Sequence, residues 1–237
     1  MTTPTSSLWR YAVVAATCLP LLMTAQADTE ISDQFGLKDR GAGFPLNRTA
    51  TETGDTLWEA SKTVLLNGAK DAGYIAVGEP APFSARVPVP GGAKVITVEV
   101  SLHVAPASPD KPNWLAIGIG NPPLGSPPWG GGVYLRVDPS GRFGVAYSGD
   151  PNDWTSTNVI SLKSGTVPEF DPDGLTKLKL EYNSETQTIS GWANGESIFQ
   201  DISVKDHQID PAFAGFSGFG QQPNIKTAGA FLLTVSP

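Results

Sequence analysis

The sequence predicts an all-β protein, an antiparallel β-sandwich. Apolar residues alternate with polar ones in short runs that are rich in β-branched and aromatic side chains. Clusters of Gly, Pro, Asn and Asp separate these runs, and helical periodicity is hard to find. Behind the N-terminal segment about 210 residues remain, which suits one all-β domain without an internal repeat or a dividing linker.

Residues 1–27 have the composition of a secretory signal peptide. Arg10 is their only charged residue, the apolar run that follows it is too short to span a membrane, and Ala25–Ala27 is a small-residue cleavage pattern. The sequence therefore predicts cleavage after this pattern and one exported domain over residues 28–237, secreted, periplasmic or at the cell surface, without membrane insertion. The alternative is a lipoprotein with its lipid on Cys18, but the residues around this cysteine suit a lipidation site poorly.

Charge and cysteine content exclude several classes of partner and chemistry. The chain has 16 Lys and Arg against 23 Asp and Glu, a net charge of −7, and removal of Arg10 with the signal peptide changes this to −8. Nucleic acid and anionic membranes are not expected partners, because no basic patch would neutralise phosphates. Since Cys18 is the only cysteine, the mature domain has no thiol, and its stability must come from its core.

The clearest expected strand is Lys94–Val104. Every second residue is apolar, so one face of the strand can join a core while the other stays mostly polar. The apolar face comprises Ile96, Val98, Val100, Leu102 and Val104. Thr176–Tyr182 alternates in the same way and returns through Thr188–Ala193, and Phe231–Val235 is the expected last strand. Trp58 lies in a strand-like segment and is expected in the core, whereas the position of Trp192 is left open.

Residues 133–147 predict a β-hairpin. The segment Asp138–Gly141 combines the fixed φ of a proline with a glycine suited to a left-handed position, which predicts a three-residue loop with a bulge. In that register Asp138 pairs with Arg142, and Tyr134 and Arg136 point away from the core. The predicted core positions are Leu135, Val137, Val145 and, in the later hairpin, Leu180.

Five segments along the mature chain carry a family resemblance. They are Asp33–Phe35, Leu178–Asn183, Ile189–Gly195, Ala214–Gly220 and Phe231–Val235. Their order resembles that of secreted bacterial domains of the concanavalin A-like lectin and glucanase superfamily, including laminin G-like modules. The resemblance implies a jelly-roll sandwich over nearly all of the mature chain. It also implies a glycan or polysaccharide as ligand, although fold alone transfers neither binding nor cleavage.

No catalytic motif of that superfamily is present. Its glucanases carry two glutamates on one strand in the pattern Glu-x-Asp-x-x-Glu, and this spacing does not occur here. Neither Glu99 nor Glu181 has a second carboxylate among its same-face neighbours, which glycoside hydrolysis would need. We therefore expect a non-catalytic, lectin-like carbohydrate-binding domain. A glycan-active hydrolase or lyase and a structural or adhesive surface protein remain the alternatives.

Aromatic side chains are the best candidates for ligand contact, because sugar rings stack on exposed aromatic surfaces. Trp114 shares a strand face with small residues that leave room beside it, although a packed strand or loop could equally fill that room. Trp129 and Trp154 lie in loop-like segments, where they can bind a ligand or anchor the loop. The predicted ligand-binding set is Trp114, Trp129, Tyr134 and Trp154 for stacking, with Glu99, His103 and Arg136 for sugar hydroxyls.

We expect no cofactor and no metal, with calcium as the weaker alternative. Asp150–Asp153 and Glu169–Gly174 each gather several oxygen ligands, but calcium needs six to eight, and Asx turns explain both segments as well. Members of the superfamily that this chain resembles often carry an acidic residue just before the closing strand. In those members the residue belongs to a calcium site that joins the first and last strands. This chain has Ala228–Ala230 there.

Overall fold

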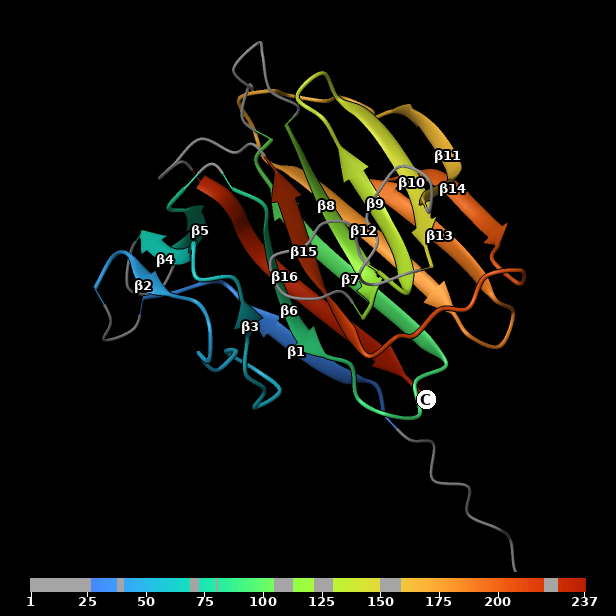
Figure 1. The fold of residues 1–237 in the computed structure, drawn as a ribbon, viewed down its shortest axis with the longest axis horizontal. Coiled ribbons are helices and arrows are strands. Elements are labelled where there is room, and N and C mark those ends of the chain that lie inside the picture. Colours follow the sequence, from blue (N-terminus) through green and yellow to red (C-terminus); the bar gives the residue numbers. More distant parts are fainter. Residues whose placement is uncertain are drawn as a thin grey trace, which may run out of the picture.

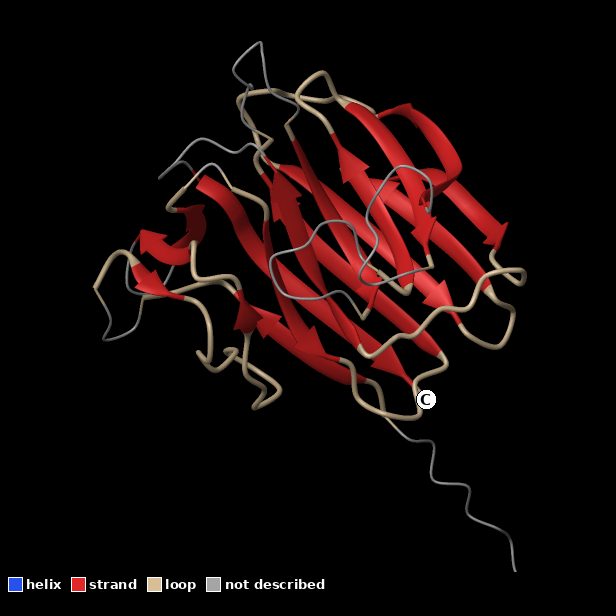
Figure 2. Ribbon diagram, viewed as in Figure 1, coloured by secondary structure: helices blue, strands red, loops and turns tan. Residues whose placement is uncertain are grey.

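The computed structural model describes residues 27–37, 41–68, 73–79, 81–104, 113–121, 130–149, 159–219 and 226–237. Within these ranges the chain forms strands and no helix, and Figure 2 shows strands joined by loops throughout. None of the described residues forms a helix that could cross a membrane. The predicted all-β class is confirmed.

The larger of two layers is a nine-stranded antiparallel sheet, called the large sheet below. Its order is β14-β13-β12-β7-β16-β5-β4-β2, and β1 also pairs with β16. Its strands are β1 (Thr29–Asp33), β2 (Phe44–Pro45), β4 (Val64–Gly68), β5 (Gly73–Val77), β7 (Val95–Leu102), β12 (Thr176–Asn183), β13 (Thr188–Ala193), β14 (Glu196–Ser203) and β16 (Lys226–Ser236).

The second layer overlaps the large sheet in projection (Figure 1). It contains a five-stranded sheet in the order β3-β6-β15-β8-β9, and β9 turns into β10, which pairs with β11. We call these seven strands the small layer. They are β3 (Glu59–Ala60), β6 (Phe83–Pro88), β8 (Trp114–Gly120), β9 (Gly132–Val137), β10 (Arg142–Ser148), β11 (Val159–Thr166) and β15 (Phe213–Phe219).

Strand β7 confirms the alternation predicted for Lys94–Val104. All five apolar positions of that segment are buried in the core between the layers, and the residues between them are only half-buried. The strand lies in the middle of the large sheet, hydrogen-bonded to β12 on one side and β16 on the other. A period of two therefore predicted the buried face, because successive side chains of a strand point to opposite sides.

The hairpin from β9 to β10 also follows its predicted register. The N–H of Asp138 donates to the carbonyl of Arg142 at 3.0 Å, and Gly141 has a φ of 75°. One carboxylate oxygen of Asp138 accepts the N–H groups of Ser140 at 2.9 Å and Arg142 at 3.1 Å. The predicted core positions Leu135, Val137, Val145 and Leu180 are all fully buried.

Trp58 joins the two layers. Its indole is fully buried, and the ring centroid lies 4.8 Å from that of Phe231 in the large sheet and 5.8 Å from that of Phe216 in the small layer. The indole N–H donates to Oδ2 of Asp33 at 2.8 Å, and Oδ1 of the same carboxylate accepts the N–H of Phe35 at 2.7 Å. The expected core position of Trp58 is confirmed, and its one polar atom has a partner, as a buried indole requires.

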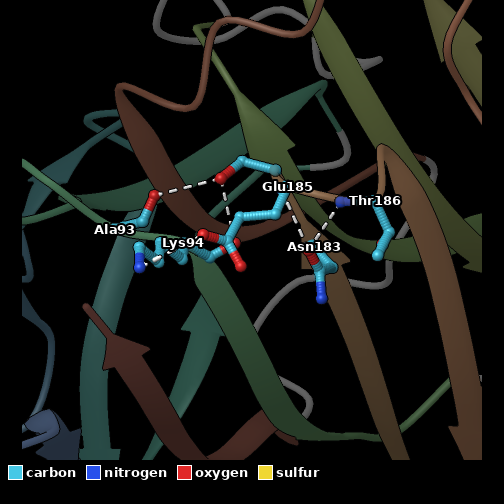
Figure 3. A network of polar contacts seen from close by, with 6 residues as sticks. Ala93, Lys94, Asn183, Glu185 and Thr186 are labelled. Carbon is cyan, nitrogen blue, oxygen red and sulfur yellow. Dashed lines mark hydrogen bonds and ion pairs between the residues drawn. The ribbon is translucent and has the colours of Figure 1, made fainter.

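A turn after β12 is tied to the start of β7 by the polar network in Figure 3. The carbonyl of Lys94 accepts the N–H of Ser184 at 2.7 Å and its hydroxyl at 3.0 Å. Within the turn, Oδ1 of Asn183 accepts the N–H groups of Glu185 and Thr186, both at 3.0 Å. Because these bonds involve backbone groups at the strand ends, they hold β12 in register beside β7.

A tight turn at Asn194 and Gly195 connects β13 to β14. Both residues have positive φ, 51° and 85°, as a type I′ turn requires. Trp192, which the sequence left open, is half-buried on β13, and Nζ of Lys179 lies 4.3 Å from its ring centroid. This tryptophan is therefore a residue of the outer surface of the large sheet.

We predict that Leu180→Ala lowers the free energy of unfolding by about 2–5 kcal/mol, because it leaves a cavity in the sealed core. Leu57, with 54% of its surface exposed, is the matched control, and Leu57→Ala should change stability little. Chemical denaturation of both variants measures the difference. Equal stabilities would show that the face of β12 is misassigned.

We predict that Trp58→Phe costs about 1–3 kcal/mol from the lost hydrogen bond to buried Asp33, with a further loss from the smaller ring. Trp192→Phe is the control, because that indole lies on the surface of the large sheet. Urea unfolding of both variants, followed by circular dichroism, tests this expectation. A Trp58→Phe variant as stable as the control would contradict a structural role for the indole N–H.

Candidate functional site

The candidate site lies on the face of the small layer that points away from the core, called the outer face below. Residues directly opposite in neighbouring strands share a face, so the register shows which side chains are neighbours. One row across β15, β8 and β9 reads Ser217, Ala116, Arg136, and the adjacent row reads Gly215, Gly118, Tyr134. Trp114 pairs with Phe219 at the end of β8. Three predicted ligand residues are therefore brought together here: Trp114, Tyr134 and Arg136.

Tyr134 anchors a small apolar cluster on the outer face, separate from the main core. It packs with Ala116 and Ala146, and Trp114 and Phe213 are partly buried against them. Only 4% of Tyr134 is exposed, so its ring is not the open stacking surface that the sequence suggested. Burial raises the pKa of its phenol, and the nearby Arg136 guanidinium opposes that shift. The phenol is therefore a neutral hydrogen-bond donor at neutral pH.

Arg86 and Glu59 form an ion pair at one side of the outer face. Both Nε and Nη2 of Arg86 donate to Oε2 of Glu59, at 3.0 and 2.8 Å. The guanidinium carbon also lies 3.7 Å from the ring centroid of Phe213. Glu59 is the only carboxylate in the seven strands of the small layer, and it is already bound to a cation.

Arg136 is an exposed cation of the outer face. Its side chain crosses Gly144 on β10, since a Cβ built on that glycine would lie 3.1 Å from Nε of the arginine. Glycine at this position therefore leaves room for the guanidinium. Within the described part of the chain, Arg136 has no hydrogen bond or ion pair, so its five N–H donors are free to bind a ligand.

Two buried hydroxyl groups of the small layer lack a hydrogen-bond partner. They belong to Ser217 on β15 and Ser148 on β10, and both side chains are almost completely buried. A buried hydroxyl without a partner costs about 1–3 kcal/mol, and an enclosed water can bind at such a place. Ser217 is the more relevant, because only Ala116 separates it from Arg136 in the same row.

Glu99 and His103 do not belong to this site. Glu99 on β7 and His103 directly after it point away from the core, and β7 is in the large sheet, so both lie on the opposite side of the sandwich from Trp114. Oε1 of Glu99 is 2.7 Å from Nζ of Lys177 on β12. The expectation that one face holds the whole predicted set is wrong for these two residues. Alternation shows which side of its own strand a residue occupies, but not which sheet the strand joins.

Glu99 instead lines a groove of about 310 Å³ on the outer surface of the large sheet. The groove is lined by Glu30, Ser32, Gln34, Glu99, Ser101, Lys177, Ala230, Phe231 and Leu232. Its one aromatic residue, Phe231, has its ring in the core beside Trp58. The groove thus offers hydrogen bonds but no aromatic surface on which a sugar ring could stack.

Trp129, Trp154 and the acidic segment Asp150–Asp153 lie outside the described residues. In the other acidic segment, Oδ1 of Asp171 accepts the N–H of Asp173 at 3.0 Å, which is the Asx turn considered as the alternative to calcium. Among the described residues no cluster of three or more His, Cys, Asp or Glu side chains could hold a metal ion.

Sequence reasoning missed three residues of the outer face: Arg86, Phe213 and Ser217. The signal for two of them was present in β15, where Phe213, Gly215 and Ser217 alternate with the core residues Ala214 and Phe216. Arg86 was harder to find, because its place beside Phe213 follows from pairing of β6 with β15 across a long stretch of sequence.

No protein-family model and no curated protein matches this sequence. Solved structures do match. The carbohydrate recognition domain of Emp47p has a TM-score of 0.54 at 12% identity, over 83% of this chain and 95% of that one. An endo-1,3-beta-glucanase from Streptomyces sioyaensis has a TM-score of 0.50 at 13% identity, over 89% and 97% of the two chains.

A protein of unknown function with a galectin-like fold from Bacillus subtilis is a third match. Its TM-score is 0.51 at 10% identity, over 76% of this chain and 90% of that chain. Identities this low show a shared fold and nothing about shared residues. The chain shares the antiparallel β-sandwich fold of these proteins, which is the fold that its sequence pattern resembles.

Proposed function

We propose that this protein is a non-catalytic, lectin-like domain that binds a glycan on the outer face of the small layer. The observation that carries the proposal is the composition of that face. It combines the half-buried aromatic Trp114 with the free hydrogen-bond donors of the exposed Arg136. An aromatic surface beside a few polar groups is the usual composition of a small-molecule site. The fold shared with the Emp47p carbohydrate recognition domain supports the proposal.

The small layer favours binding over cleavage. Hydrolysis of a glycosidic bond requires two carboxyl groups about 5 to 9.5 Å apart across the bond. The strands of this layer contain one carboxylate, Glu59, and Arg86 already binds it. The carboxylates of the large sheet, Glu99 among them, lie on the other side of the sandwich or in the core.

A glycan-active enzyme is the second candidate, because the Streptomyces sioyaensis glucanase shares the fold over 89% of this chain. Under this alternative, the catalytic carboxylates would come from loops at the rim of the small layer. A reducing-sugar release assay on the same polysaccharides separates the two candidates, since a binding domain should release no sugar.

Trp114→Ala should weaken glycan binding by about 1–3 kcal/mol if the indole is an anchor residue, with little effect on folding. Trp192→Ala is the matched control, a half-buried tryptophan on the far side of the sandwich. The measurement is a calorimetric titration of the best ligand from a glycan array against both folded variants. Trp129→Ala and Trp154→Ala belong in the same series, as their loop positions predict a part in binding. Equal affinity of all variants would reject the site.

We infer from the N-terminal pattern that the protein is exported and cleaved after Ala27. Cleavage there leaves the sandwich intact, because the first strand begins at Thr29. N-terminal sequencing of the exported form should read from Asp28. An exported form that starts at Met1, or one with a lipid on Cys18, would contradict this cleavage site.

A further inference from the structure

The two layers of the sandwich differ in charge. The strands of the small layer contain four cationic side chains, Arg86, Arg136, Arg142 and Lys163, against the single carboxylate of Glu59. The strands of the large sheet contain three cationic and six acidic side chains. The strands of the small layer thus carry an excess of positive charge in a chain whose net charge is −7.

Only one of these cations is both free and directed at the proposed site. Arg86 is held by Glu59, and Arg142 lies 3.8 Å from the carboxylate of Asp138 at the hairpin turn. Lys163 sits on the edge strand β11, opposite the core residue Val145. Arg136 remains, exposed on the outer face and without an ion pair among the described residues.

The polar neighbours of Arg136 across the strands of the small layer are hydroxyl groups. Tyr134 is a neutral phenol in the adjacent row, and the hydroxyl of Ser217 lies in the same row with no partner of its own. The strands contribute no free carboxylate to accept a bond from a sugar hydroxyl, since Glu59 is bound to Arg86. The exposed guanidinium of Arg136 only donates hydrogen bonds, and it fits a group that accepts them and carries negative charge.

We propose that the glycan held on the outer face is an acidic one, and that Arg136 binds its carboxylate or sulfate ester. This inference rests on the proposed glycan-binding function. A planar guanidinium can form two parallel hydrogen bonds with either anion, and Trp114 lies on the same face for contact with the sugar ring.

The experiment compares charged polysaccharides with uncharged forms of the same backbone. The probes are polygalacturonate and its carboxyl-reduced form, and dextran sulfate and dextran, with the full exported chain immobilised for biolayer interferometry. We expect at least one acidic polymer to bind about tenfold or more tightly than its uncharged counterpart, because hydrogen bonds to charged groups are the strong ones. That preference should weaken at high salt, since Arg136 is exposed. The pair that shows the preference identifies the anion.

Three variants test the role of Arg136. Arg136→Gln should abolish the preference for the acidic polymer, and Arg136→Lys should retain part of it, because the charge stays while the planar fork is lost. Arg142→Gln is the matched control, because it removes one positive charge from the same layer. Asp138 already pairs with Arg142, so this variant should leave binding unchanged. Thermal melts of all three check folding, which surface substitutions should not disturb.

The possible failures are distinguishable. If neutral polymers bind as well as acidic ones and Arg136→Gln has no effect, the inference is overturned while the proposed glycan binding stands. If no polysaccharide binds, both are overturned. A DNA duplex bound as tightly as the acidic polymer, with the same loss in Arg136→Gln, would overturn the acidic-glycan assignment, because the face would then bind polyanions without regard to sugar.

Discussion

The two-layer arrangement depends on the buried contact between Trp58 and Asp33. The indole packs on Phe231 of the large sheet and on Phe216 of the small layer, so one side chain contacts both halves of the core. Its N–H donates to Asp33 at the end of β1, and the same carboxylate accepts the N–H of Phe35. A sandwich without disulfides must hold its layers together by such packing, because no covalent link restricts its unfolded state.

The composition of the outer face follows from how the layers pack. Because β8 places its large apolar residues in the core, its other face carries Trp114 beside Ala116 and two glycines. Small residues there let Tyr134 and Phe213 approach one another as a second apolar cluster, and Gly144 makes room for Arg136. The face therefore combines an apolar cluster with the exposed cation of Arg136.

The same fold supports both binding and cleavage of glycans, so function has to be argued from side chains. In this chain the positions of the carboxylates distinguish binding from cleavage. Glu59 in the small layer is neutralised by Arg86, whereas Glu99 is paired with Lys177 across the groove on the large sheet. The strands of the small layer therefore present no free carboxylate, and their excess of cationic side chains is the basis of the proposed acidic ligand.

The sequence by itself determined the all-β class, the hairpin register at Asp138 and the buried face of β7, because alternation and turn chemistry are local properties of the chain. It also showed that Glu99 and Arg136 both point away from the core. Only the tertiary structure decided that these two residues lie on opposite sides of the sandwich. Strand order in a sheet depends on pairing between segments far apart in sequence, such as β6 with β15, and the period of two within one strand carries no information about that pairing.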